Sequence, residues 1–339
     1  MLNRFIVALC LLALAGPSIS QAAPEPSIVE SAAPEPADVG EKILVVGQRP
    51  GPGLWKVSKG DHTMWIFGSY APLPIKMEWR SHEIESILSQ AQEFISPPSA
   101  APDISMLRMV TLVPFAFGAT KIPDDKKLSD VLPPDIYSRW VPLKQKYLGK
   151  DDGVERERPI FAADRLYWAV LKQAGLGNGR DVRERINQLV KKNNIKVTNP
   201  AIKLAVDSPV RAIREFKKSS LDDTECFAKT LEQLETDIDN MKLRANAWSK
   251  GDVDAIRKLT FPDRAGACSN AIISSGALKK QPGFQDVDAR MKEAWMAAVE
   301  KSIAANKTTF AVLPMRYALD PNGYLADLKA RGYTVENPE

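Results

Sequence analysis

Two short apolar runs, residues 54–58 and 63–68, flank a polar stretch that contains Gly60. Strand-forming runs at this separation predict a β-hairpin, with His62 at its exposed tip. A helical pattern follows, in which the apolar residues are Ile84, Ile87, Leu88 and Ala91. This pattern predicts an amphipathic helix and then a short strand, which completes a strand, crossover helix, strand unit.

The middle of the chain carries helix-compatible apolar spacing between Pro and Gly residues. It predicts four helices, over residues 133–148, 158–174, 181–192 and 209–217. A more regular stripe, alternating by four and three, consists of Phe227, Leu231, Leu234, Ile238, Met241, Ala245 and Trp248. It predicts one long helix that ends at Gly251. A coiled-coil dimer could use this stripe, but an antiparallel helix pair inside one domain fits so short a seam better.

The C-terminal part repeats the strand, helix, strand order, with a strand over residues 308–313 and a helix start at Asp320-Pro321. If both units share one sheet, the residues after Gly68 and Leu313 meet at its edge, where ligand sites of open α/β sheets usually lie. We therefore predict a helix-rich α/β (α+β) fold. Its central mixed sheet is built from N- and C-terminal strand-helix-strand halves flanking a helical middle.

One long apolar stretch, residues 104–119, is interrupted by Arg108 and Pro114. A membrane-spanning helix needs about 18 or more uninterrupted apolar residues, so this stretch predicts a buried helix instead. No other stretch after the N-terminal segment is long enough, and we expect no transmembrane helix in the mature protein.

Residues 1–22 are typical of a secretory signal peptide, because Arg4 precedes an unbroken apolar core at residues 5–15. Ser20-Gln21-Ala22 fits the small-x-small cleavage rule, so we expect cleavage after Ala22 and a periplasmic or secreted protein. Removal of this segment leaves 317 residues with a formal net charge of +3.

Residues 23–53 are rich in Pro, Ala, Glu and Gly. Such a composition buries too little apolar surface to fold, so we predict a disordered linker followed by one folded domain over residues 54–339. A short apolar run at residues 43–47 suits either an edge strand that binds a partner or a nonspecific apolar patch of the linker.

Export leaves two cysteines, Cys226 and Cys268. An even pair in an oxidising compartment predicts a disulfide bond, and two buried free thiols are the alternative. The basic residues between 191 and 218 are interspersed with acidic ones and predict a solvated face. The mildly basic balance of the chain gives no indication of nucleic-acid binding.

Short motifs recur in order along nearly the whole predicted domain: Leu54-Trp55-Lys56-Val57-Ser58, Phe67-Gly68-Ser69, Gly179-Arg180-Asp181, Ala247-Trp248-Ser249-Lys250-Gly251-Asp252, Arg290 with Trp295, Phe310-Ala311-Val312 and Arg331-Gly332-Tyr333-Thr334-Val335. Each is weakly specific alone, but their order and spacing resemble the TraB/GumN family, which includes TraB, PrgY, GumN and the Tiki proteins. The resemblance implies a metal-dependent hydrolase scaffold, whose catalytic members use two Gly-x-x-His motifs and acidic residues to activate a metal-bound water.

The chain departs from that pattern at each ligand position. The first motif reads Gly68-Ser69-Tyr70-Ala71, with alanine where the family has histidine, and the second reads Leu313-Pro314-Met315-Arg316. The acidic position falls near Ser96-Pro97. Neither His62 nor His82 lies at a predicted strand edge, and the fixed positive charge of Arg316 disfavours a cation there. We therefore predict no catalytic residue, no metal site and no cofactor.

A remnant cleft is predicted to contain Gly68, Ser69, Tyr70, Arg290 and Arg316. A tyrosine and two arginines can hold a carboxylate or phosphate by charge-assisted hydrogen bonds, unless internal ion pairs engage the arginines. The leading hypothesis is thus a degenerate, non-catalytic TraB/GumN homologue that binds an anionic small molecule or peptide. The alternatives are a metal-dependent hydrolase or peptidase with atypical divalent-metal ligands, and an interaction role of the linker and the striped helix.

Overall fold

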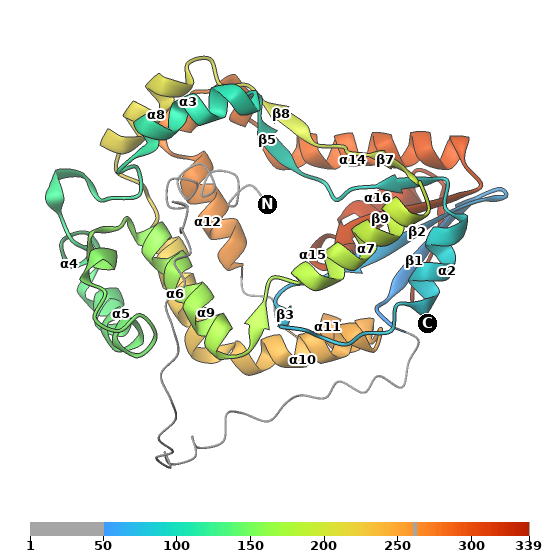
Figure 1. Cartoon of the computed structure of the whole chain (residues 1–339), viewed down its shortest axis with the longest axis horizontal. Helices are drawn as coiled ribbons and strands as arrows, with labels where there is room; N and C mark the ends of the chain where they lie inside the picture. Colours follow the sequence, from blue (N-terminus) through green and yellow to red (C-terminus); the bar gives the residue numbers. More distant parts are fainter. Residues whose placement is uncertain (1–50, 260–262, 339) are drawn as a thin grey trace, which may run out of the picture.

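The computed structural model describes residues 51–259 and 263–338 (Figure 1). The predicted signal peptide, the apolar run at residues 43–47 and most of the predicted linker lie outside the described residues.

A six-stranded mixed sheet forms the centre of the fold, in the order β10-β1-β2-β9-β4-β7. Its strands are β1 (Leu54–Lys59), β2 (His62–Ser69), β4 (Glu93–Ile95), β7 (Lys196–Thr198), β9 (Thr308–Pro314) and β10 (Thr334–Glu336). The hairpin of β1 and β2 is antiparallel, as predicted, whereas β2, β9, β4 and β7 run parallel. Two smaller sheets pair β3 (Leu73–Pro74) with β6 (Leu176–Gly177) and β5 (Ala100–Pro102) with β8 (Ile202–Leu204).

The predicted meeting of the two strand-helix-strand units is confirmed. Strand β2 pairs directly with β9, and Gly68 lies opposite Leu313 in the register. The next pair, Ser69 and Pro314, ends both strands at the same edge of the sheet. Segments about 240 residues apart in sequence therefore leave the sheet side by side.

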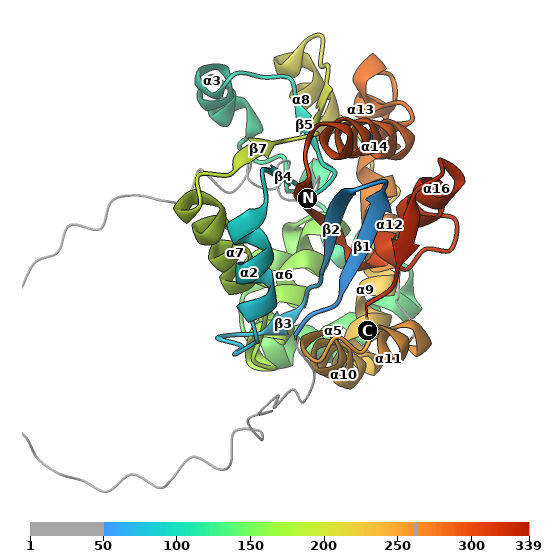
Figure 2. The ribbon, with the colours of Figure 1, turned by 90° about the vertical axis from the view of Figure 1, so that its right-hand side faces the viewer.

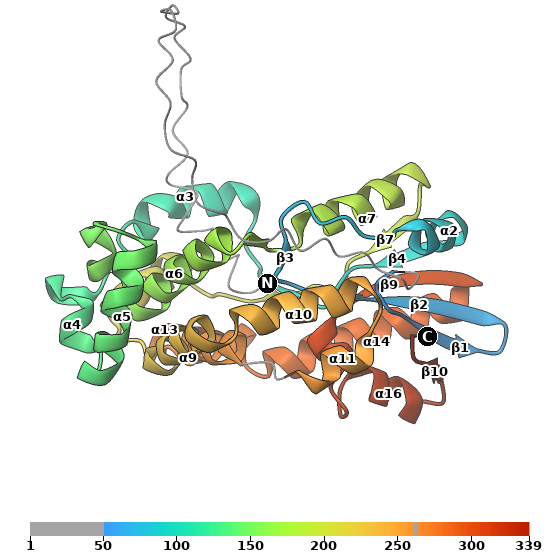
Figure 3. The ribbon, with the colours of Figure 1, turned by 90° about the horizontal axis from the view of Figure 1, so that it is seen from below.

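Helices surround the sheet and form a separate lobe beside it. They are α2 (His82–Gln90), α3 (Met106–Ala116), α4 (Leu128–Val131), α5 (Pro134–Tyr147), α6 (Pro159–Gln173), α7 (Arg180–Lys192), α8 (Pro209–Lys218), α9 (Thr224–Thr236), α10 (Ile238–Ser249), α11 (Val253–Lys258), α12 (Arg264–Ile273), α13 (Gly276–Lys279), α14 (Val287–Ala305), α15 (Met315–Ala318) and α16 (Tyr324–Ala330). Figure 2 shows α2 and α7 on one side of the sheet and α14 and α16 on the other. Figure 3 shows the lobe that contains α4, α5, α6 and α9 at the opposite end of the molecule from the β1–β2 hairpin.

Two apolar clusters stabilise these parts. In the sheet cluster, the Phe67 ring stacks on Phe310 and meets Trp248 edge-on. In the helical lobe, Trp140 of α5 packs against Phe227 of α9 with ring centroids 5.3 Å apart. Aromatic side chains bury large apolar areas, so these contacts dominate the packing of both clusters.

The striped segment forms two helices rather than one. The helix breaks at Asp237, which ends α9 and precedes α10. The stripe is buried inside the chain: its first half joins the helical-lobe cluster, whereas Ala245 and Trp248 join the sheet cluster. The stripe therefore packs within the chain, but the prediction of a continuous helix is wrong, because the helix ends at Asp237, whose carboxylate pairs with Arg244 of α10.

The predicted disulfide joins Cys226 of α9 to Cys268 of α12, with the Cα atoms 4.5 Å apart. The prediction of a buried helix at residues 104–119 is wrong in part. Helix α3 buries only Leu112 and Ala116, and Met106, Leu107, Val110 and Phe115 are exposed. The 19-residue helix α14 was not predicted from the pattern.

Candidate functional site

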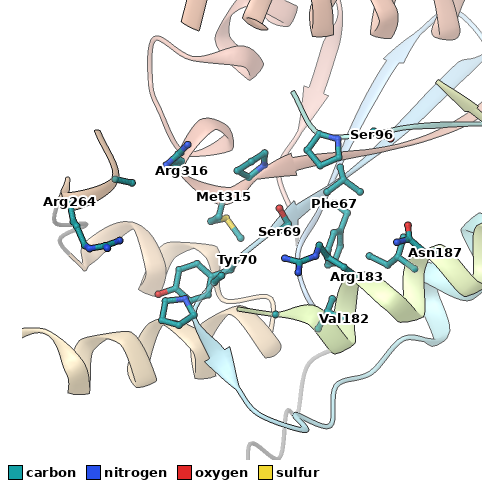
Figure 4. Close-up of a pocket in the computed structure, with 18 of the residues that line it drawn as sticks. Phe67, Ser69, Tyr70, Ser96, Val182, Arg183, Asn187, Arg264, Met315 and Arg316 are labelled. Carbon is teal, nitrogen blue, oxygen red and sulfur yellow. The ribbon is translucent and has the colours of Figure 1, made fainter. Parts of the chain in front are cut away.

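A pocket of about 710 Å³ lies at the carboxyl ends of β2, β4 and β9, facing the helical lobe (Figure 4). We call it the sheet-edge pocket. Its polar and charged lining residues are Ser69, Tyr70, Ser96, Tyr167, Arg183, Asn187, Gln233, Asp263, Arg264 and Arg316. It thus lies where parallel strands of α/β sheets usually present their ligand sites.

The positions where the resemblance implies metal ligands all converge on this pocket. Ala71 follows β2, Ser96 and Pro97 follow β4, and Arg316 follows β9, and all four residues line the cavity. The parallel β2–β9–β4 pairing accounts for this convergence, because it ends the three strands at one edge. A methyl group, a hydroxyl and a guanidinium therefore stand where the family's catalytic members place metal-binding groups.

Three of the predicted cleft residues, Ser69, Tyr70 and Arg316, line the pocket. Gly68 does not, because a side chain at this position would point to the opposite side of the strand. A Cβ at this position would lie 2.6 Å from the Trp55 ring and 2.9 Å from Met315 Cε. The Gly68 carbonyl accepts a hydrogen bond of 2.7 Å from Trp248 Nε1. Gly68 is therefore required for packing behind the pocket rather than for lining it.

Arg290 is not brought to the pocket. It lies in the first turn of α14, where its guanidinium donates hydrogen bonds to the carbonyls of Gly283 and Gln285, at 2.8 and 3.4 Å, and to that of Lys203 at 3.3 Å. Its role is to hold the chain before α14 against β8. The sequence pattern could not separate this role from ligand binding.

Two other arginines, Arg183 and Arg264, take the place predicted for Arg290. Arg183 lies in α7 one turn after Gly179, and its Nη1 donates to the Asn178 carbonyl at 3.0 Å. Its closeness to the Gly179-Arg180-Asp181 motif is the signal that could have identified it. Arg264 begins α12, and no sequence signal pointed to it.

The three arginines differ in how strongly the protein itself engages them. Arg264 donates to Asp164 at 2.8 Å and to Thr230 Oγ1 at 3.0 Å, and it lies 4.0 Å from the centre of the Tyr167 ring. Arg316 lies over the ring of its neighbour Tyr317 and donates to that hydroxyl at 3.0 Å. Within residues 51–259 and 263–338, no carboxylate forms an ion pair with Arg316. Arg316 is also exposed, whereas Arg183 is half-buried and Arg264 is buried, so Arg316 is the guanidinium most open to an anionic ligand.

Tyr70 connects the pocket wall to a buried charge pair. Its hydroxyl accepts a hydrogen bond of 3.0 Å from Arg244 Nε, and Arg244 also pairs with Asp237. Burial raises the pKa of Tyr70 to about 12, although the Arg244 charge opposes the shift. The phenol therefore keeps its proton at neutral pH, so no negative charge on Tyr70 opposes an anion in the pocket.

The pocket does not fit a divalent metal ion. A catalytic site of this kind needs at least three imidazole, thiolate or carboxylate ligands. Asp263 is the only such residue in the lining, and the described part of the chain holds no group of three or more. His62 contacts the Asn306 carbonyl at the far end of β2, and His82 begins α2.

Comparison with known proteins is consistent with this geometry. A model of the TraB/PrgY/gumN family matches residues 53–337, which is most of the chain. Searches of curated proteins and of solved structures give no significant match.

Proposed function

This chain belongs to the TraB/PrgY/gumN family, and we propose that it is an exported, non-catalytic member that binds an anionic small molecule or peptide in the sheet-edge pocket. The observation that carries this proposal is the charge of the lining. Among the described lining residues are three arginines, Arg183, Arg264 and Arg316, and one carboxylate, Asp263.

The chemistry of the lining favours carboxylate or phosphate groups. A guanidinium presents several N–H donors in a plane, which matches these anions in two-point hydrogen bonds. Arg316 offers this group just after the end of β9. The pocket walls also include apolar residues such as Phe67 and Val312. A partly apolar wall strengthens such charge-assisted bonds, because it lowers the local dielectric constant.

The beginning of α7 adds a second favourable term. Gly179, which precedes this 13-residue helix, lines the pocket together with Val182 and Arg183 of its first turn. Helix N-termini carry a partial positive charge that favours anions by roughly 0.3–1 kcal/mol. The helix end and the arginines therefore both favour an anionic ligand.

Export is part of the proposal and rests on the signal-peptide pattern of residues 1–22. A disulfide such as Cys226–Cys268 persists in an oxidising compartment and is rare in the cytosol of most organisms. Mass measurement of the native protein tests this part. We expect an N-terminus at Ala23 in the periplasmic or secreted fraction, and an intact Met1 in the cytosol would contradict it.

Binding is tested by calorimetric titration with inorganic phosphate, citrate and an acidic peptide. We expect at least one of these probes to bind, and Arg316→Gln to weaken its binding by about tenfold or more, because a charge-assisted bond is lost. Arg257→Gln is the matched control, since Arg257 of α11 pairs with Asp254 and does not line the pocket. If no probe binds, or if Arg316→Gln binds as well as wild type, the binding proposal is wrong.

Metal analysis tests the non-catalytic part of the proposal. We expect no stoichiometric Mn, Co or Zn in the purified wild-type protein, and metal binding only after Ala71→His and Arg316→His are combined. These substitutions restore imidazoles at two positions that share the pocket. A tightly bound metal in the wild type at this pocket would instead favour a hydrolase or peptidase with atypical ligands.

A further inference from the structure

Helix α3 carries the most exposed apolar surface in the described part of the chain. The four most exposed large apolar side chains there all belong to residues 106–117: Leu107 is 85% exposed, Met106 80%, Phe117 79% and Val110 65%. Outside this segment, no described large apolar side chain is more than 55% exposed. Contiguous apolar surface of this kind marks an interaction site more often than single exposed residues do.

The opposite side of α3 fixes it to the protein. Leu112 and Ala116 are buried, and α3 packs against α8. Figures 1 and 2 show the pair at an outer corner of the molecule, with α3 away from the central sheet. The exposed apolar side of α3 therefore faces away from α8.

The neighbouring helix α8 adds positive charge beside α3. It carries Arg211, Arg214, Lys217 and Lys218 against one acidic residue, Glu215, and α3 itself adds Arg108. Lys217 Nζ donates to the Phe117 carbonyl at 2.7 Å, and the Arg214 guanidinium lies 5.5 Å from the centre of the Phe115 ring. These contacts place cationic groups at the edge of the exposed apolar surface.

We propose that α3 and α8 form a membrane-binding surface, on which the apolar side of α3 enters the interfacial region of a bilayer and the basic residues contact anionic lipid headgroups. Charge complementarity selects this occupant, because an apolar helix side bordered by Lys and Arg is typical of helices that lie on anionic membranes. The chain would lie on the bilayer rather than cross it, since no helix within residues 51–259 and 263–338 is long and apolar enough to span one. Under this proposal, the predicted solvated basic residues of α8 also contact lipid headgroups.

Flotation with lipid vesicles tests this proposal on the full purified protein. We expect binding to phosphatidylcholine vesicles that contain 30% phosphatidylglycerol, and much weaker binding to phosphatidylcholine alone or at high salt. Replacing Met106, Leu107 and Val110 together by Ser should reduce the vesicle–water partition coefficient by about tenfold or more, because three apolar side chains no longer enter the bilayer. Arg211→Gln combined with Arg214→Gln and Lys218→Gln should reduce binding to the anionic vesicles only.

Matched controls lie far from α3. Leu243→Ser removes an exposed apolar side chain on α10, and Lys301→Gln with Lys329→Gln removes two charges on α14 and α16. We expect these variants to bind like wild type. Mass measurement verifies that all the compared proteins have the same N-terminus. Failure of wild type to bind, or unchanged binding of the α3 variant, overturns the proposal. A dimer that dissociates when the α3 side chains are replaced would assign the surface to a second copy of the chain instead.

Discussion

Arg244 Nε donates a hydrogen bond of 3.0 Å to the hydroxyl of Tyr70, which lies 174 residues earlier in the sequence. The same guanidinium pairs with Asp237 in the break between α9 and α10, and both members of the pair are buried. The pocket wall is therefore tied to the one irregular point of the striped segment.

Removing Arg244 tests the importance of this connection. Arg244→Ala should lower the free energy of unfolding by about 3–5 kcal/mol, because it leaves the Asp237 carboxylate buried without its cation. Replacing both residues, as Asp237→Leu with Arg244→Met, should cost less than Arg244→Ala alone. Urea denaturation of wild type, Asp237→Leu, Arg244→Met and the double variant gives the coupling energy. Additive costs would contradict a coupled pair.

Gly68→Ala tests the packing behind the pocket. The added Cβ would lie 2.6 Å from the Trp55 ring, closer than real Cβ contacts, so neighbouring groups must shift. Overpacking of this kind costs about 1–3 kcal/mol of unfolding free energy, measurable by urea denaturation. Gly276→Ala is the matched control, because nothing lies within 4 Å of a Cβ there and its φ is not positive. Equal stabilities of the two variants would disprove the steric role of Gly68.

Local patterns were sufficient to predict much of this fold. The β1–β2 hairpin, helices α5 to α8 and the meeting of Gly68 with Leu313 follow from apolar periodicity and from the rule that parallel strands share a carboxyl edge. The break at Asp237 could not be predicted in this way, because the apolar stripe runs through it without a Pro or Gly to mark a boundary. The exposure of α3 likewise depends on which helix packs beside it, because apolar residues lie on most sides of this helix.

The candidate site was predictable only where a motif marks it. Ser69, Tyr70 and Arg316 follow strands whose ends are visible in the sequence. Arg264 reaches the same pocket from α12, whose position is set by the packing of the helical lobe and by the disulfide. Arg290 and Arg264 are the same residue type, and only the tertiary structure shows which of them faces the cavity.

The Cys226–Cys268 disulfide should contribute strongly to stability. It closes a separation of 42 residues, for which the loop-entropy model gives roughly 4 kcal/mol. We expect Cys226→Ala with Cys268→Ala to lower the urea midpoint, and dithiothreitol to lower that of wild type but not of the variant. If dithiothreitol leaves the urea midpoint of the wild type unchanged, this expectation is wrong.

The carboxylate of Asp223 lies between two helices, because this residue precedes α9 and lies next to the start of α6. It is buried, and its Oδ2 accepts a hydrogen bond of 2.9 Å from the backbone N–H of Ile160. Burial raises the pKa of Asp223 to about 6, although the Ile160 hydrogen bond and the Arg158 charge oppose the shift. The folded protein thus holds a proton on this carboxyl more tightly than the unfolded chain, in which the pKa is about 3.9.

The sign of the pH effect follows from this difference. Between about pH 4 and pH 6 the folded state binds more protons at Asp223 than the unfolded state, so its contribution to stability falls as the pH rises through this window. Asp223→Asn imitates the protonated form and should be more stable than wild type at pH 7 by about 3 kcal/mol, with no advantage at pH 4. Urea denaturation of both proteins from pH 4 to pH 7.5 measures this, and the difference between them cancels the contributions of other groups. A pH-independent difference would mean that Asp223 stays ionised in the folded protein, stabilised by Arg158 and the Ile160 amide.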